Sequence, residues 1–469
     1  MVARALLLLL LAVVVASDPS SILLPDINAV YPVGAGADSN PFVAALGPAP
    51  SLAACISTAI VWRNTTSASA VRCRAASWLR APSNTSLTGD CFCRIDVRWL
   101  AVPSPGVDSA RLIWPCASAS DCSFNGECDA DSACACDVGW SGPFCGELRL
   151  LPVDAAAQGL RFVNNAGENV STWGAPMLRD ESTGLWHAWP SEMVNDCGIN
   201  SWTTNSHIVH ATALTPGGPW LRQEEVVPVF AHEPNVVRGP SGEWVMVYSG
   251  YMLPEPSSSR CTNCANGVTL NHSSHNGCGP NASHGFKKLL SVATSPNGPW
   301  GTPIDITKLD EPWDWNLAIA ILPNGTAIGL LRACFVWRAT KYDDVVTWQP
   351  VGGSPQGPPL PDSNVEDPFV WLDKRGIFHS VMHAMEVAEM GGAFCGGHAF
   401  SQDGLTWVNT GFAYSNVVNF TDGSVQSFSR RERPHILFAA DGSTPIALSN
   451  GVEYGNNDAI FSLVQPIFH

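Results

Sequence analysis

The stretch EDPFVWLDKRG at residues 366–376 contains the pattern that decides the fold. An acidic residue and a proline precede a run of apolar residues, and Gly376 follows the marker residue Asp367 by nine positions. A run of this kind that ends at a glycine predicts a β-hairpin, with the apolar run as its first strand.

Four other segments share this frame of a marker residue, an apolar strand, a glycine nine positions after the marker and a second apolar strand. Their markers are Ala175, Glu233, Asn316 and Arg433. Successive markers lie 58, 83, 51 and 66 residues apart, and a repeat of this size is typical of propeller blades. We therefore predict that residues 147–469 form an all-β domain, a five-bladed β-propeller.

Two further features agree with this fold. Tryptophans that follow a turn lie between the markers, and we expect them to pack between neighbouring blades; they are Trp220, Trp300, Trp348 and Trp407. Only 36 residues follow Arg433, enough for three strands of the last blade. We expect the fourth strand to come from the start of the domain, around residues 148–162, so that it closes the ring.

The N-terminus predicts a secreted protein. Residues 1–16 combine Arg4, an apolar run over residues 6–15 and a small residue at Ala16, which is the pattern of a cleaved signal peptide. The alternative, a signal anchor, needs an apolar run of about 20 residues. No later stretch is long enough to span a membrane. Seven Asn-x-Ser/Thr sequons agree with secretion and predict a glycoprotein; they are at Asn64, Asn84, Asn169, Asn271, Asn281, Asn324 and Asn419.

The composition excludes several classes of protein. Charged residues make up 14 % of the chain and hydrophobic residues 45 %, so wholesale disorder is excluded. The formal net charge is -16, and no Lys/Arg cluster is present to neutralise phosphates. Nucleic acids and anionic membrane surfaces are therefore not expected as partners.

Six cysteines at residues 116–145 are separated by 5, 5, 5, 1 and 8 residues, and this spacing resembles that of an EGF-like module. The resemblance implies the disulfides Cys116–Cys128, Cys122–Cys134 and Cys136–Cys145. It implies no calcium, because residues 112–115 lack the acidic residues that such modules use. We expect a spacer or a docking module, through which a protein partner would bind. Residues 17–115 form a separate N-terminal domain with four cysteines of open pairing, which weakly resembles apple/PAN modules.

Six cysteines of the propeller region follow the second strand of a repeat and precede its third; they are Cys197, Cys261, Cys264, Cys278, Cys334 and Cys395. We expect disulfides that hold long loops on one face of the propeller. The alternative is a zinc site, because Cys261, Cys264, His272, His275 and Cys278 have a similar spacing to zinc ligands. The oxidising compartment and the sequons at Asn271 and Asn281 favour disulfides.

The markers and the residues before them open the innermost strands, so we expect them to ring the central funnel. The preceding residues are Gly174, His232, Trp315, Glu366 and Glu432. A ring of acids, amides, a cation and aromatic residues suits a hydroxyl-rich ligand such as a sugar, with Trp173, Trp202, Trp313 and Trp315 as stacking faces. Alternatively, Glu233, Asp367 and Glu432 cap blade starts and pair with Arg433 or with backbone amides.

The motifs at residues 366–369, with Asp373, Gly376 and His379, and at residues 432–435 resemble those of five-bladed propeller glycosidases. This group surrounds glycoside hydrolase family 43 and the arabinanase/levansucrase/invertase superfamily, and the resemblance covers residues 150–469. It implies a carbohydrate-active protein that hydrolyses furanoside or xyloside glycans of the arabinan, xylan or fructan class. Members use three acids, and the acid expected at the start of the first blade corresponds to Ala175.

The remaining candidates for catalysis are Glu233, Asp367 and Glu432, with Glu233 as general acid and Asp367 as base. Sugar binding is assigned to Trp173, His232, Trp315, Asn316 and Arg433. A two-carboxylate mechanism requires two of the acids within about 10 Å, and Glu192 or Asp196 is an alternative third acid. Because Ala175 cannot act as a base, a non-catalytic glycan-binding or adhesive protein is the alternative function.

No cofactor and no metal site are predicted from the residues, although the resemblance allows a calcium ion in the channel. His379 and His435 would be near such an ion, but a single histidine after a blade start is more often packed in the core.

Overall fold

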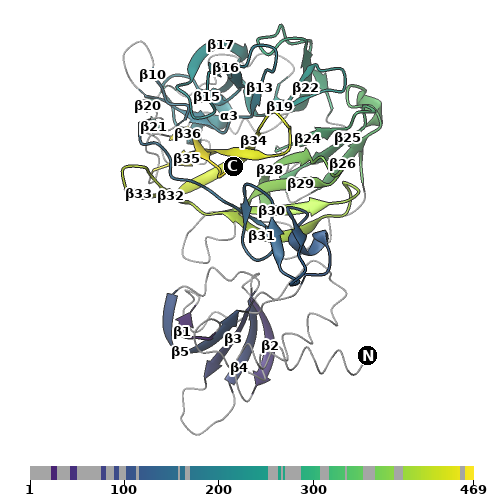
Figure 1. The fold of residues 1–469 in the computed structure, drawn as a ribbon. Coiled ribbons are helices and arrows are strands. Elements are labelled where there is room, and N and C mark those ends of the chain that lie inside the picture. The colour runs from purple at the N-terminus through teal and green to yellow at the C-terminus, as the bar shows by residue number, and fades with distance from the viewer. Residues whose placement is uncertain are drawn as a thin grey trace.

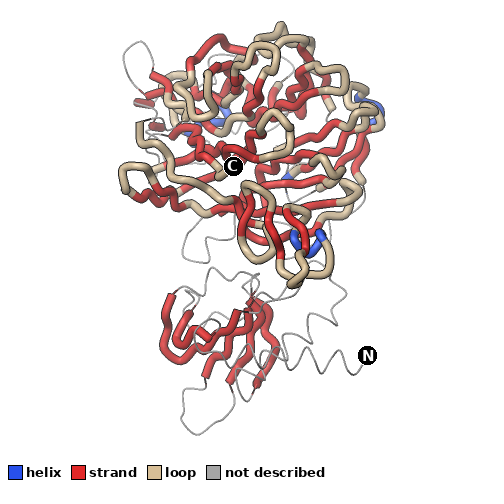
Figure 2. The backbone as a smooth tube through the Cα atoms, viewed as in Figure 1, coloured by secondary structure: helices blue, strands red, loops and turns tan. Residues whose placement is uncertain are grey.

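The structure, a computed structural model, describes residues 23–28, 43–49, 75–80, 89–94, 102–111, 116–156, 159–163, 169–251, 262, 264–265, 268–269, 287–306, 316–332, 335–351, 365–384, 395–454 and 460–469. Strands and the loops between them make up nearly all of this part of the chain (Figures 1 and 2). The predicted signal peptide lies outside the described residues.

Five separate antiparallel sheets follow one another along the chain from residue 172, and they are the five predicted blades. Blade one contains β12 (Thr172–Trp173), β13 (Met177–Arg179), β14 (Trp186–Ala188), β15 (Ser191–Met193), β16 (Ser206–Ala213) and β17 (Leu221–Val227). Blade two contains β18 (Ala231–Arg238), β19 (Trp244–Gly250), β22 (Lys287–Ala293) and β23 (Ile304–Asp305). Blade three contains β24 (Ala318–Ile321), β25 (Ala327–Leu330), β26 (Val336–Ala339) and β27 (Gln349–Pro350).

Blade four contains β28 (Val365–Leu372), β29 (Phe378–Ala384), β30 (Cys395–Ser401) and β31 (Val408–Tyr414), and blade five contains β34 (Arg430–Phe438), β35 (Pro445–Glu453) and β36 (Ile460–Pro466). Short two-stranded pairs lie outside the blades; they are β10 (Phe162–Val163) with β11 (Asn169–Val170), β20 (Cys264–Ala265) with β21 (Val268–Thr269), and β32 (Val417–Asn419) with β33 (Val425–Ser427). The helical segments among the described residues of this region are α3 (Trp202–Asn205), η4 (Ile199–Ser201) and η7 (Val345–Thr347).

The start of the domain closes the ring, as predicted. Leu150 pairs with Ile467 and Leu160 with Ser462, both antiparallel, beside β36 of blade five. The backbone N–H of Leu151 donates to the carbonyl of Pro466 at 2.8 Å, and that of Leu160 donates to the carbonyl of Ser462 at 2.9 Å. Among the described residues, the predicted fourth strand is thus present as two isolated bridges beside blade five, whose own sheet contains β34, β35 and β36.

The four predicted tryptophans pack between blades. Trp220 contacts the blade-five core, Trp300 lies against the core between blades one and two, Trp348 is fully buried between blades two and three, and Trp407 lies between blades three and four. Each large indole ring fills space between two twisted sheets, which explains why the signature recurs in four of the five blades.

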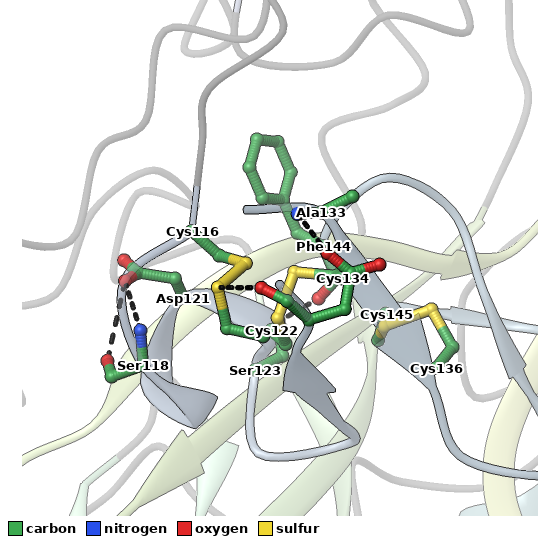
Figure 3. Close-up of a disulfide and its surroundings, with 12 residues drawn as sticks. Cys116, Ser118, Asp121, Cys122, Ser123, Ala133, Cys134, Cys136, Phe144 and Cys145 are labelled. Atoms are coloured by element: carbon green, nitrogen blue, oxygen red, sulfur yellow. Dashed lines mark hydrogen bonds between the residues drawn. A yellow bond between two sulfur atoms is a disulfide. The ribbon is translucent and has the colours of Figure 1, made fainter. Parts of the chain in front are cut away.

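Residues 116–148 form the small module before the propeller, with η3 (Ala119–Cys122), β6 (Gly126–Cys128), β7 (Cys134–Cys136), β8 (Trp140–Ser141) and β9 (Glu147–Leu148). Its disulfides are Cys116–Cys128, Cys122–Cys134 and Cys136–Cys145, as the EGF-like resemblance implied (Figure 3). The module lies beside β30 and β31 in Figure 1, and its cysteines, Trp140 and Leu148 share one apolar cluster with blades four and five. It is a docked module and not a spacer.

A further sheet lies before the module, with β1 (Leu23–Asn28), β2 (Val43–Ala49), β3 (Ala75–Arg80), β4 (Gly89–Arg94) and β5 (Val102–Arg111) in the order β1-β5-β3-β4-β2. Its cysteine pairing and its likeness to apple/PAN modules stay predictions. In the part of the chain that the structure describes, no helix is long and apolar enough to cross a membrane.

Candidate functional site

The first strands of blades two, four and five each begin with a bulge. Glu233, Asp367 and Arg433 have φ angles of 58°, 54° and 53°, and the register with the second strand shifts at each of them. A residue with a side chain costs about 1–2 kcal/mol in this left-handed conformation, so surrounding contacts must hold it. The three markers therefore have one backbone geometry and present their side chains in equivalent ways.

In blade one the equivalent residue is Gly174, with a φ of 60°, and not Ala175. The following hairpin confirms the shift. Asp180 and Asp373, each six residues after the left-handed residue, donate their N–H to Leu185 and Ile377 at 2.8 and 2.9 Å. Ala175 is buried in the core between blades one and five. The predicted frame was wrong by one residue here, because blade one contains one additional residue in its first hairpin.

Arg433 fills the space that a side chain at residue 174 would need. A Cβ atom built on Gly174 would lie 2.6 Å from Cβ and 3.2 Å from Cγ of Arg433. The acid expected at the first blade is thus absent, and a guanidinium from blade five lies next to its position.

Four of the predicted site residues meet at this point. Asp367 accepts hydrogen bonds from Nη1 of Arg433 at 3.0 Å, from the Arg433 backbone N–H at 3.2 Å and from Nδ2 of Asn316 at 2.5 Å. Oε1 of Glu233 lies 3.7 Å from the same Nη1 atom. Because both distances are measured to Nη1 of Arg433, Oε1 of Glu233 and Oδ1 of Asp367 are at most about 6.7 Å apart.

This cluster is buried, and burial determines its electrostatics. Desolvation raises the pKa of Asp367 to about 6, against the opposing charge of Arg433 and with the help of Glu366 and Glu432. Burial opposes the charge of Arg433, but Glu233 and Asp367 outweigh it and raise the pKa of the guanidinium.

A second group of acids adjoins the first. Ligand-type atoms of Glu366, Asp367, His383 and Glu432 all lie within 4.8 Å of one another. Burial lowers the pKa of His383, but the charges of Glu432 and Glu366 outweigh it and raise that pKa. Glu432 therefore lies close to the proposed base, as expected of a funnel residue.

This group does not fit a calcium ion. Each of its three carboxylates already has an arginine: Arg332 lies 2.9 Å from Glu366, Arg430 3.0 Å from Glu432 and Arg433 3.0 Å from Asp367. Calcium needs six to eight oxygen ligands of net negative charge, and here the negative charge is already balanced. The calcium ion that the resemblance allowed is not supported by these residues.

His435 and His379 are packed histidines. Burial lowers the pKa of His435 to about 3, and its ring contacts Phe369. His379 stacks on Trp371 and hydrogen-bonds His398 at 3.1 Å.

The predicted sugar-binding residues differ in how they are placed. His232 accepts from or donates to Ser206 Oγ at 2.6 Å, stacks on Trp202 and lies close enough to Arg433 for its charge to lower the histidine pKa further, after burial. Trp173 is 3 % exposed and its ring lies against Gly451. Trp313 and Trp315 lie outside the described residues. The sugar-binding roles of all of them stay predictions.

Glu192 is not a replacement for the missing acid. It lies on β15, where its neighbour Ser191 accepts the backbone N–H of Glu233 at 3.1 Å, so the two successive side chains point to opposite faces of the strand. Its carboxylate is held by His207 at 2.9 Å and Arg222 at 2.8 Å. Asp196 is half-buried in the loop after β15, and a catalytic role for it stays untested.

Three site residues were not found from the sequence. The repeat marks Gly174 only as the residue before Ala175, and it does not single out His383 or Arg332. The cross-strand pairing of Glu366 with His383 follows from hairpin register and was within reach of the sequence. The contact between Arg332 and Glu366 joins two blades, and no local pattern predicts it.

The propeller cysteines are described only in part. Cys197 is disulfide-bonded, which agrees with the disulfide expectation for this residue. Cys261, Cys278 and Cys334, and the histidines of the alternative zinc site, lie outside the described residues, and of Cys264 and Cys395 only the backbone is described.

No family model matches the chain, and no curated protein matches it. Among solved structures, the chain is similar to a family 117 glycoside hydrolase of the marine bacterium Zobellia galactanivorans, at 12 % identity over 69 % of this chain and 90 % of that chain, with a TM-score of 0.43. It is also similar to an α-L-arabinofuranosidase of Podospora anserina, at 13 % identity over 66 % and 94 %, with a TM-score of 0.42. An endo-arabinase of Bacteroides thetaiotaomicron gives 12 % identity over 66 % and 98 %, with a TM-score of 0.38.

Similarities at this level carry no argument about activity. What is established is the architecture, a five-bladed β-propeller preceded by a module with EGF-like disulfides, and it stands on the sheets and disulfides of the chain itself.

Proposed function

We propose that this protein is a secreted carbohydrate-active enzyme that hydrolyses glycosidic bonds of furanoside or xyloside glycans, the arabinan, xylan or fructan class, in the propeller channel. One observation carries the proposal: carboxylates from blades two and four, Glu233 and Asp367, lie within about 6.7 Å of each other on either side of Arg433. Two carboxyl groups at such a separation are the smallest set of catalytic groups that this reaction requires. The class of glycan rests on the motif resemblance.

In this mechanism Asp367 is the base and Glu233 the acid. A pKa of about 6 leaves Asp367 ionised at neutral pH and still able to take a proton from water. The water attacks the anomeric carbon while Glu233 gives its proton to the leaving oxygen. Arg433 stays within 3.0 Å of Asp367, where its charge opposes the effect of burial and favours the ionised form of the base.

A second candidate function is non-catalytic glycan binding. It is favoured by the absence of a side chain at Gly174 and by the guanidinium of Arg433 between the two acids. In that case Asp367, Arg433 and Asn316 would bind sugar hydroxyls without a reaction.

The test is release of reducing sugars from arabinans, xylans and fructans by the secreted protein and by its Glu233→Gln and Asp367→Asn variants. General acid and base groups contribute about 10²–10⁴-fold each, so each variant should lose at least about 100-fold in kcat/KM. Glu192→Gln is the matched control, because it removes a buried carboxylate that does not belong to the site. As Asp367 must be ionised, kcat/KM should rise with pH through about pH 6.

Activity that survives both substitutions would refute the assignment of the acids. No release from any polymer, with retention of the protein on one of them in a pull-down, would establish the binding function instead.

Secretion and glycosylation belong to the same proposal. The described sequon residues Asn169, Asn324 and Asn419 are all exposed, and Asn324 lies in the turn between β24 and β25. Treatment of the secreted protein with an endoglycosidase should reduce its apparent mass, and Asn324→Gln should remove one step of that change. A partner protein for the EGF-like module stays a prediction.

A further inference from the structure

A cavity of about 170 Å³ lies where the EGF-like module meets the β28–β29 hairpin of blade four and the β34–β35 hairpin of blade five. None of the residues that line it belongs to the site of Glu233 and Asp367. A single water molecule needs about 10–15 Å³ on the same kind of measure, so the cavity accommodates a small organic ligand. Binding sites occur preferentially at such junctions between domains.

One wall of the cavity is aromatic. Trp140 of the module and Trp371 of blade four are nearly parallel, at 18°, with ring centroids 6.5 Å apart, and Phe438 of blade five lies 5.5 Å from Trp371. Trp140 and Trp371 are only 6 % and 8 % exposed, so this wall offers a ligand a small apolar contact and not a free ring face.

The charged groups of the other wall are compensated. Nη1 and Nη2 of Arg375 donate to the Asp137 carboxylate at 2.7 and 3.2 Å. Asp373 accepts the N–H of Arg375 at 2.9 Å and lies 3.6 Å from His379. Lys374 is exposed at the rim, where solvent screens it. A cavity with paired charges gives no net attraction to an ion and favours a neutral ligand.

Hydroxyl and amide groups complete the lining, from Ser443 and Thr444 of blade five and Asn125 of the module. A neutral ligand that bears many hydroxyl groups and a small apolar part fits both walls. We propose that this cavity binds one neutral sugar residue of a glycan, at a second site separate from the channel. This inference does not depend on hydrolysis in the channel.

The experiment measures binding of arabinose, xylose, fructose, galactose and glucose to the full chain by ligand-observed NMR. Ser443→Trp and Val138→Trp each place a large ring in the cavity, from blade five and from the module; Val138 is 52 % exposed, so this change does not enter a core. Ser241→Trp is the matched control, because Ser241 occupies a similar turn of the β18–β19 hairpin and donates its N–H to an acid as Ser443 does. Asp367→Asn alters the channel site and leaves the lining of the cavity unchanged.

We expect saturable binding of at least one sugar by the wild type and by the Ser241→Trp and Asp367→Asn variants, and at least tenfold weaker binding by both cavity-filling variants. Three results would overturn the inference: no binding of any of the five sugars at tens of millimolar, undiminished binding by the filling variants, or loss of binding in Asp367→Asn. The last result would locate the sugar in the channel and leave the proposed function intact.

Discussion

Gly174, Glu233, Asp367 and Arg433 occupy one backbone position in four blades, and their side chains determine what the channel can do. Two carboxylates, the guanidinium of Arg433 and Gly174, which has no side chain, meet there. Because the guanidinium lies between the acids, the cluster is an ion network in the absence of a ligand. Acid–base chemistry in the channel therefore depends on the contacts of Arg433 with both acids.

The close approach of Gly174 to Arg433 predicts a steric cost that goes beyond the backbone. Gly174→Ala adds both a left-handed alanine and a Cβ at 2.6 Å from Cβ of Arg433. Gly376→Ala is the control, since Gly376 also has a positive φ but nothing within 4 Å of an added Cβ. We expect Gly376→Ala to cost about 1 kcal/mol and Gly174→Ala at least about 1 kcal/mol more, as measured by urea unfolding. Equal costs would show that Arg433 moves away freely.

The raised pKa of Asp367 predicts a dependence of stability on pH. Its pKa is about 6 in the folded chain and 3.8 as a free group, so the folded state binds more protons between these values. This residue's contribution to the free energy of unfolding therefore falls as pH rises from about 4 to about 6 and stays low above that. Asp367→Asn removes the titrating group and keeps an acceptor for Arg433. The difference in unfolding free energy between Asn variant and wild type should shift in favour of the variant over this window. A difference independent of pH would contradict the assignment.

Two of the blade hairpins contain the same arrangement of one aspartate and two histidines. In blades one and four an aspartate at the turn is followed by two histidines on neighbouring strands: His187 hydrogen-bonds His210 at 2.8 Å, and His379 hydrogen-bonds His398 at 3.1 Å. In blade four this pair also contacts the EGF-like module, where Nδ2 of Asn125 lies 3.3 Å from Nε2 of His398. One hairpin thus supports both the blade and the docked module.

Arg375 on the β28–β29 hairpin is expected to hold the module in place. It donates to Asp137 and, at 2.9 Å, to the carbonyl of Phe124, but its side chain is 29 % exposed. Partly exposed pairs of this kind are worth about 1 kcal/mol. Arg375→Ala should therefore increase hydrogen exchange in β6 and β7 of the module by about fivefold. Arg179→Ala, in the corresponding hairpin of blade one, is the control and should leave that exchange unchanged. If Arg375→Ala also leaves it unchanged, the apolar cluster alone holds the module.

Two contacts between distant parts of the chain complete the fold. Leu150 and Leu160 form bridges with Ile467 and Ser462 and close the ring. Thr172 strengthens this seam, since it accepts the N–H of Ser462 at 2.9 Å and donates to the carbonyl of Leu160 at 3.0 Å. The module packs its cysteines and Trp140 on blades four and five. Both contacts bring together residues that are more than 200 positions apart.

Ring closure predicts a difference between two shortened chains. A chain that starts at Glu147 loses the module but keeps the closing segment, whereas one that starts at Asn169 loses both. Without the closing segment, blade five exposes an edge strand and the ring has a gap. The first chain should unfold cooperatively at a lower midpoint than the full protein, and the second should lack a cooperative transition in near-UV circular dichroism. Identical transitions for both would show that the closing segment adds no stability.

The blade repeat, the turn glycines and the tryptophans between blades could all be predicted, because each depends on spacing along a short stretch of chain, whereas the disulfides of residues 116–145 were implied by the resemblance to an EGF-like module. Hairpin turns, strand period and cysteine gaps are local properties, and they leave a regular trace in the sequence. The same reasoning placed Glu233, Asp367 and Arg433 at equivalent positions, which their shared φ angles confirm.

Only the tertiary structure decided that Gly174 replaces Ala175 in the frame, that Arg433 fills the place of the missing acid, that Glu192 points away from the site and that the module is docked. One extra residue in a hairpin changes which side chain enters the channel. The repeat spacing along the sequence does not reveal this extra residue. The contacts of Arg433 with Gly174, Glu233 and Asp367 join four different blades. Their energies depend on burial and on distances across the ring, which the order of residues along the chain does not encode.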